Sequence, residues 1–81
     1  MRLIDIGHGN LVSDEAVVSV VSPDSAPVKR LIKQAQDDGK LIDASYGRKT
    51  RSVLIMKSDH VVLSSLETDD LKTRFTDAER F

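Results

Sequence analysis

Short apolar runs, most of them rich in valine, isoleucine and leucine, alternate along this chain with clusters of Gly, Asn, Asp, Ser and Pro. β-Branched aliphatic residues favour strands, whereas the intervening residues favour turns. The run at 16–21 has near-continuous apolar character, which predicts burial on both faces, and in so small a domain a neighbouring subunit could cover one of them. The Ser58-Asp59 pair predicts a hairpin between the last two strands. The predicted strands are 2–6, 16–21, 41–45, 52–57 and 60–65, with Leu11-Val12 between the first two.

The segment 23–27, Pro-Asp-Ser-Ala-Pro, is the clearest helix start in the sequence. Asp24 or Ser25 can cap the free N–H groups of the first turn, where a proline is tolerated. Gly39 predicts the end of this helix, as the C′ residue after about Asp38. Its apolar stripe, at helical spacing, comprises Val28, Leu31, Ile32 and Ala35, and leaves Lys29, Arg30, Lys33 and Gln34 facing solvent.

A second, weaker helix is expected near the C-terminus. Thr68 is a suitable N-cap, and the two acidic residues after it favour the positive end of a helix dipole. The apolar face of this helix is sparse and consists of Leu71, Phe75 and Ala78. We therefore expect one small α/β (α+β) domain over 1–66, with four or five strands and one main helix, followed by a C-terminal helical extension over 67–81.

Composition narrows the class of protein. The chain has 81 residues, a formal net charge of −1 and no cysteine. A domain of this size buries only about 60–65% of the surface that its unfolded chain exposes, and with no disulfide possible the remaining common means of stabilisation is self-association. No apolar run approaches the roughly 18–20 residues of a membrane span, and the N-terminus has no apolar signal region. We expect a complete, cytoplasmic protein without a membrane partner.

Positive charge is concentrated in one segment of this otherwise balanced chain. Residues 44–58 contain four cations and no acid, and three of these cations, Arg48, Lys49 and Arg51, lie within four residues. They follow Gly47 and precede an apolar run, which predicts a turn that presents guanidinium and ammonium groups from a strand. Such groups suit phosphate. From the residues alone, the segment is either a phosphate-binding site or a solvated hairpin connection that keeps the protein soluble.

Other candidate chemistry is weak. Neither His8 nor His60 has a cysteine or carboxylate at ligand spacing, so a structural or interface role is favoured for both. The Gly7-x-Gly9 pair lacks the third glycine and the following helix of a dinucleotide-binding loop, and no serine lies in a nucleophile elbow. The cations of the first helix are better explained as a solvent-facing surface than as a second phosphate track. We expect no enzyme activity, cofactor, metal or small-molecule substrate.

Five strings of the sequence, in order and without large gaps over about residues 3–65, match one family. They are IDIGHGN at 4–10, VSPDSAPVKR at 21–30, GKLIDA at 39–44, GRKTR at 47–51, and Met56 followed by SDHVVLSS at 58–65. Through these strings the chain resembles the RemA-type extracellular-matrix regulatory proteins of Gram-positive and related bacteria.

The resemblance implies a domain related to the LytTR type of DNA-binding domain, assembled into a homo-oligomeric ring, an octamer. It implies a transcriptional activator of biofilm-matrix and osmoprotection genes that binds repeated sites on double-stranded DNA. The DNA-contacting positions would be Arg48 and Lys49, with Arg51 close behind.

Two departures from the family's pattern bear on these expectations. Family members often have arginine at the position of Lys49, and lysine lacks the bidentate fork of a guanidinium. Many also have a basic residue at the position of Ala16. The alternative function, from another class, is a non-enzymatic scaffolding ring whose basic turn binds an acidic protein partner. The sequence feature that discriminates between them is the acid-free window at 44–58.

Overall fold

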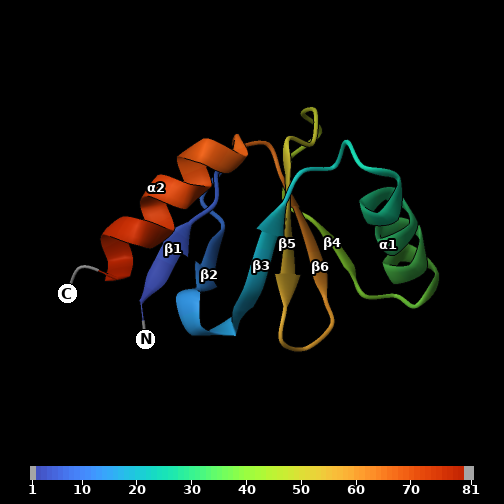
Figure 1. The fold of residues 1–81 in the computed structure, drawn as a ribbon, viewed down its shortest axis with the longest axis horizontal. Coiled ribbons are helices and arrows are strands. Elements are labelled where there is room, and N and C mark those ends of the chain that lie inside the picture. The colour runs from blue at the N-terminus through green and yellow to red at the C-terminus, as the bar shows by residue number, and fades with distance from the viewer. Residues whose placement is uncertain (1, 80–81) are drawn as a thin grey trace.

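The computed structural model describes the backbone of residues 2–79 and the side chains up to residue 76. Within these residues the fold is a small α+β domain with six short strands in two sheets and two α-helices (Figure 1). The expected four or five strands are six, because the segment after the first turn forms a strand of its own. The elements are β1 (Leu3–Asp5), β2 (Leu11–Ser13), the 3₁₀ turn η1 (Asp14–Ala16), β3 (Val17–Val21), α1 (Ala26–Asp37), β4 (Leu41–Asp43), β5 (Ser52–Met56), β6 (Val61–Ser64) and α2 (Thr68–Glu79).

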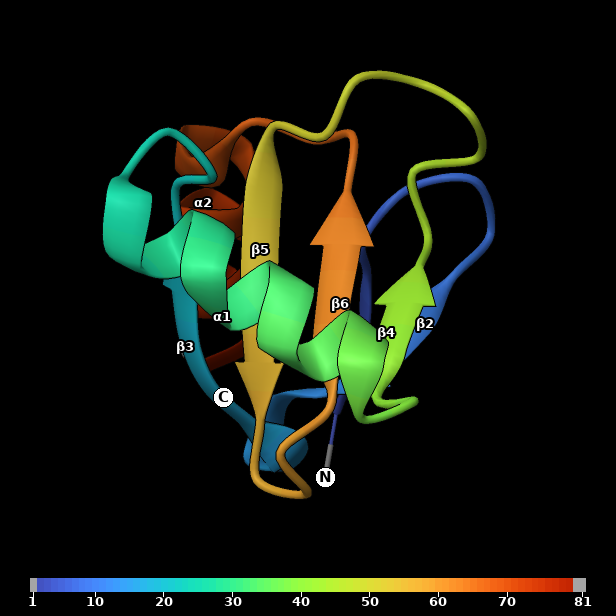
Figure 2. The same cartoon turned by 90° about the vertical axis from the view of Figure 1, so that its right-hand side faces the viewer.

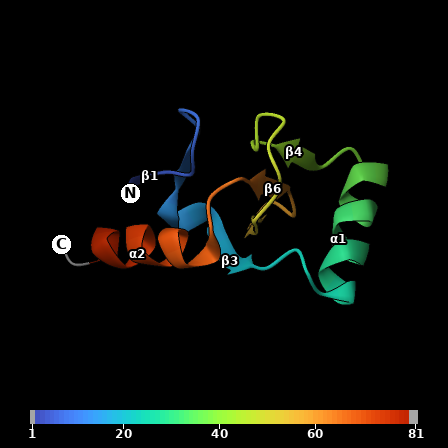
Figure 3. The same cartoon turned by 90° about the horizontal axis from the view of Figure 1, so that it is seen from above.

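The elements form three layers, of which the middle one is a four-stranded sheet. Its strand order is β3-β5-β6-β4, with β4 parallel to β6 and the other neighbours antiparallel. Helix α1 crosses one face of the sheet (Figure 2), whereas α2 and the antiparallel pair β1–β2 lie on the other side (Figures 1 and 3). The predicted hairpin of the last two strands is confirmed, since β5 and β6 are adjacent and antiparallel.

Strand β3 is an edge strand, and within one protomer it is not buried on both faces, contrary to the pattern's prediction. Cover of one face by a neighbouring subunit stays a prediction. None of its five residues is buried, and Val18 is 64% exposed. The strands with both faces covered are the central ones, β5 and β6, whose Val53, Leu54, Val61 and Val62 are almost fully buried. A continuous apolar run has the same pattern at the edge and in the middle of a sheet, so the sequence did not distinguish these positions.

Helix α1 begins and ends where the sequence predicts. The Ser25 side chain accepts a hydrogen bond of 3.3 Å from the backbone N–H of Val28, which makes Ser25 the N-cap. At the other end Gly39 has a φ of +70°, and the N–H groups of Gly39 and Lys40 reach back to the carbonyls of Gln36 and Ala35. This is a Schellman motif. The predicted apolar stripe packs on Val53, Val61 and Leu63 of the sheet.

The opposite face of the sheet holds a second core, to which α2 contributes Leu71, a fully buried residue. Leu71 packs with Ile6, Ala44, Leu54 and Val62. Helix α2 begins at Thr68 itself, so the expectation that Thr68 precedes the helix as its N-cap is wrong by one position. The expected apolar contact of Ala78 lies outside the described side chains. In the described part of the chain, no helix is long and apolar enough to span a bilayer.

Candidate nucleic-acid interface

The basic segment forms a connection that passes over the end of β6. Because β6 lies between β4 and β5, the loop of residues 44–51, called the basic loop below, cannot be the hairpin turn considered from the sequence (Figure 2). Both ends of the loop are attached to β6. The N–H of Ala44 donates to the carbonyl of Leu63 at 2.9 Å, and the N–H of Arg51 donates to the carbonyl of Ser64 at 2.9 Å. The cations are therefore presented from a loop anchored at two points.

A tight turn shapes the first half of the basic loop. Tyr46 and Gly47 both have positive φ, +58° and +77°, and the N–H of Arg48 closes the turn on the carbonyl of Ser45 at 3.1 Å. The Asp43 carboxylate accepts hydrogen bonds from the hydroxyl and the backbone N–H of Ser45. These bonds favour the ionised form, the hydroxyl bond most strongly, and lower the pKa of Asp43. A charged side chain at the end of β4 thus orients the turn that carries Arg48.

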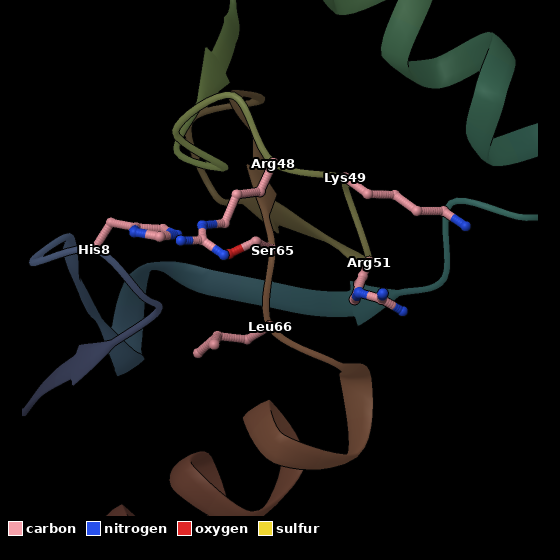
Figure 4. A pocket seen from close by; sticks show the side chains of 6 residues that line it. All are labelled: His8, Arg48, Lys49, Arg51, Ser65 and Leu66. Carbon is pink, nitrogen blue, oxygen red and sulfur yellow. The ribbon is translucent and has the colours of Figure 1, made fainter.

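All three predicted site residues line one open hollow of about 560 Å³. Figure 4 shows that Arg48 extends from the basic loop toward His8, whereas Lys49 extends away from it, so the cations are spread along the loop instead of surrounding one point. The hollow is built from three segments distant in sequence: the turn after β1, the basic loop and the junction of β6 with α2. Its lining comprises His8, Arg48, Lys49, Arg51, Ser65 and Leu66.

The cations of the hollow differ in their surroundings. The Arg51 guanidinium forms an ion pair with Glu67, at 2.7 Å between nitrogen and oxygen. Within the described part of the chain, Arg48 and Lys49 have no carboxylate partner, and both are exposed. Sequence reasoning missed Glu67, because nothing local relates it to a residue sixteen positions earlier. Two of the three predicted cations are thus available for an anion, and the third has a competing acid.

His8 also reaches the hollow, from the turn after β1. Its Nε2 lies 3.1 Å from the hydroxyl of Ser65, and its ring stacks on that of Tyr46 with centroids 5.3 Å apart. The Asn10 side chain ties this turn together, donating to the carbonyl of Gly7 at 3.0 Å and, at 3.5 Å, to that of Ala44 in the basic loop. The sequence favoured a structural or interface role for His8 but held no sign that it lies beside the basic loop.

The remaining candidates lie elsewhere. Lys57 and His60 belong to the turn between β5 and β6, where the Lys57 N–H donates to the carbonyl of Ala16 at 2.8 Å. The Lys40 carbonyl accepts from Val61 at the first residue of β6, so it too is at the far end of the strands from the basic loop. Ala16, one of the departures from the family's pattern, is therefore remote from the hollow. Among the described residues, no three His, Asp or Glu side chains could hold a metal ion.

A family model and several similar proteins agree that this chain resembles regulatory proteins. A family model described as RemA-like, extracellular matrix regulatory protein A-like, matches residues 3–75. A protein of Geobacillus kaustophilus is 49% identical over 81 residues, which are 100% of this chain and 93% of the relative. One from Carboxydothermus hydrogenoformans is 51% identical over 98% of this chain and 91% of its own length, and one from Bacillus pumilus is 51% identical over 94% and 85%. All three carry the name "Putative regulatory protein".

Proposed function

Because this chain belongs to the RemA-like family of extracellular matrix regulatory proteins, we propose that it is a transcriptional regulator that binds double-stranded DNA through its basic loop. It acts in the cytoplasm, where the DNA is, without enzymatic activity or cofactor. Its targets are genes of the biofilm-matrix type, which it activates.

The observation that carries this proposal is the common placement of Arg48, Lys49 and Arg51 around one open hollow. Cations that are exposed and spread along an anchored loop suit a row of phosphates better than a single small anion. Contacts to phosphate position a duplex without reading its bases. The selectivity of the protein would then come mainly from repetition of sites and from the deformability of the DNA.

A single protomer has too few cations for tight binding, so the proposal includes self-assembly into a closed ring, an octamer. Repeating the basic loop around such a ring would let one long duplex release many counterions at once. Exposed apolar side chains support self-association. Leu11 and Ile42, 56% and 49% exposed, line an apolar groove of about 380 Å³ between β2 and the edge strand β4, and Val18 is exposed on the other edge strand.

The test is a gel-shift comparison of a duplex of several hundred base pairs with one of about 20 base pairs, across a salt series. We expect strong preference for the long duplex and a steep loss of affinity with salt. The Arg48→Ala, Lys49→Ala double variant should lose DNA retention and keep its assembly state in sedimentation. Its matched control is Lys40→Ala, Lys57→Ala, which removes the same charge at the far end of the strands and should bind nearly normally.

Two outcomes would contradict the proposal. If the wild-type protein failed to bind DNA even at low salt, a scaffolding ring that binds an acidic protein partner would be the better explanation. If both double variants lost binding equally, only the net charge of the protein would matter, and the basic loop would have no special role.

A further inference from the structure

Tyr46 presents an aromatic ring to solvent at the tip of the basic loop. Tyr46 is 79% exposed, more than any other large apolar residue among those described. The backbone φ of Tyr46 is +58°, a value that bulky residues seldom adopt. Strained conformations of this kind persist where the surrounding structure enforces them, and they cluster at binding sites. The chain thus holds a large ring outward at a conformational cost.

The Tyr46 ring stacks on His8, a second residue with a strained backbone. His8 has a φ of +54°, between Gly7 and Gly9, which also have positive φ. The two rings are nearly parallel, 18° apart, with centroids separated by 5.3 Å, which is a stacked arrangement. The bond of His8 Nε2 to the Ser65 hydroxyl at 3.1 Å attaches the His8 ring to the end of β6. The position of the Tyr46 ring is therefore determined by groups on two other segments.

The neighbours of this stacked pair indicate what it contacts. Arg48, two residues after Tyr46, closes the same tight turn and lines the hollow together with His8. Figure 4 shows Arg48 and His8 extending toward one another above Ser65. Because Arg48 extends toward His8, on which Tyr46 stacks, an anionic polymer bound at Arg48 would lie near this stacked pair. In duplex DNA the groups next to the phosphates are the deoxyribose rings, whose C–H groups can pack against an aromatic ring, and the base edges lie beyond them.

We propose that Tyr46, positioned by His8, is a second and uncharged contact to the duplex, packing against sugar and base edges while Arg48 and Lys49 bind phosphates. This inference rests on the proposed function and adds to it the part of binding that does not depend on counterion release. Phosphate contacts determine the slope of affinity against salt. An aromatic contact changes the affinity by the same factor at every salt concentration.

The chain provides a direct probe of this contact. It contains one tyrosine and no tryptophan, so its intrinsic fluorescence at wavelengths longer than phenylalanine emission comes from Tyr46 alone. Titration of the full-length protein with a long duplex should change the Tyr46 emission in parallel with the gel shift. Single-stranded DNA of the same length is the comparison. A response to the single strand alone would overturn the proposal in favour of stacking on unpaired bases.

The variants are chosen for the unusual backbone at this position. Tyr46→Asn removes the ring but suits a positive φ, which asparagine tolerates better than other side chains do. We expect binding to the long duplex to weaken by at least about fivefold at every salt concentration, with an unchanged salt slope. Tyr46→Phe keeps the ring and should bind like the wild type. His8→Asn should weaken binding in the same way as Tyr46→Asn, and His8→Phe, which restores a stacked ring, should recover it.

The failures of the two proposals are distinguishable. Absence of wild-type binding would remove the proposed function and this inference together. Normal wild-type binding with unchanged Tyr46 emission, or a Tyr46→Asn variant that binds like the wild type, would overturn this inference alone. A Tyr46→Asn variant with a reduced salt slope would also overturn it, because the ring would then act by positioning Arg48.

Discussion

The guanidinium of Arg51 donates a hydrogen bond of 2.7 Å to the carboxylate of Glu67, joining the start of β5 to the start of α2 beside the basic hollow. The two side chains are 49% and 63% exposed. An ion pair this exposed contributes only about 0.2–1 kcal/mol to stability, so it can be broken at little cost when a phosphate competes for the arginine. Glu67 therefore matters more for the charge of the hollow than for the stability of the fold.

Replacing Glu67 should strengthen DNA binding. In Glu67→Gln the amide oxygen can still accept from Arg51, but the negative charge facing the phosphates is gone. We expect tighter binding and a salt slope steeper by up to ~0.9 for each protomer in contact with DNA, measured by gel shift across a salt series.

The control for this change is Asp59→Asn. Asp59 lies in the turn between β5 and β6, and its φ of +70° suits asparagine. The Asp59→Asn substitution removes one negative charge, as Glu67→Gln does, but far from the hollow. Equal effects of the two variants would mean that net charge alone is responsible, and weaker binding by Glu67→Gln would mean that Glu67 holds Arg51 in its binding position.

Ser52 and Ser64 face each other across β5 and β6, and both are completely buried, yet they should respond oppositely to substitution. The Ser64 hydroxyl donates to the carbonyl of Ile6 at 2.7 Å and accepts from the N–H of Leu66 at 3.1 Å. The Ser52 hydroxyl has no partner among the described residues. Ser64→Ala should lower the free energy of unfolding by about 1–3 kcal/mol, whereas Ser52→Ala should leave it unchanged or raise it.

Urea denaturation of the two serine variants, followed by far-ultraviolet circular dichroism, measures this difference. Ser64→Ala also removes the bonds that join β6 to Ile6, just after β1, and to Leu66, just before α2. Equal losses in both variants would show that Ser52 has a partner that stabilises it.

The lowered pKa of Asp43 predicts a specific loss of stability in acid. Because the ionised carboxylate is the form that accepts from Ser45, its contribution is complete above the usual value of 3.8 and disappears as the pH falls through the lowered pKa. A carbon NMR titration should find the pKa of Asp43 below 3.8 in the wild type. In Ser45→Ala, which removes the hydroxyl bond, it should move upward. A wild-type pKa at or above the usual value would exclude this role for Asp43.

Leu71 makes α2 part of the core, so its truncation should be costly. Leu71→Ala should lower the free energy of unfolding by about 2–5 kcal/mol, the range for a large buried aliphatic residue. Thermal and urea unfolding measure this loss, with Lys72→Ala, an exposed neighbour on the same helix, as the control. If Leu71→Ala were as stable as the wild type, α2 would be a dispensable extension of the domain.

The elements predicted correctly from sequence are those that depend on residues close together in the chain. Helix α1 has its N-cap at Ser25 and its C′ glycine at Gly39 because capping involves groups within a few positions of each other. The β5–β6 hairpin follows from a tight turn between two apolar runs. The grouping of three cations in one segment was likewise visible in the sequence, as was the turn at Gly47.

Which segments meet cannot be read from local patterns and follows from the three-dimensional packing. The order of strands in the sheet places β6 between β4 and β5, and this makes the basic segment a loop across the end of β6 instead of a hairpin. The same order puts β3 at an edge. The packing of β1 and α2 beside this sheet brings His8 and Glu67 to the cations from distant parts of the chain. Local propensities determine which element a segment forms, because they act over a few residues. The neighbours of that element are determined by burial of apolar surface contributed by the whole chain.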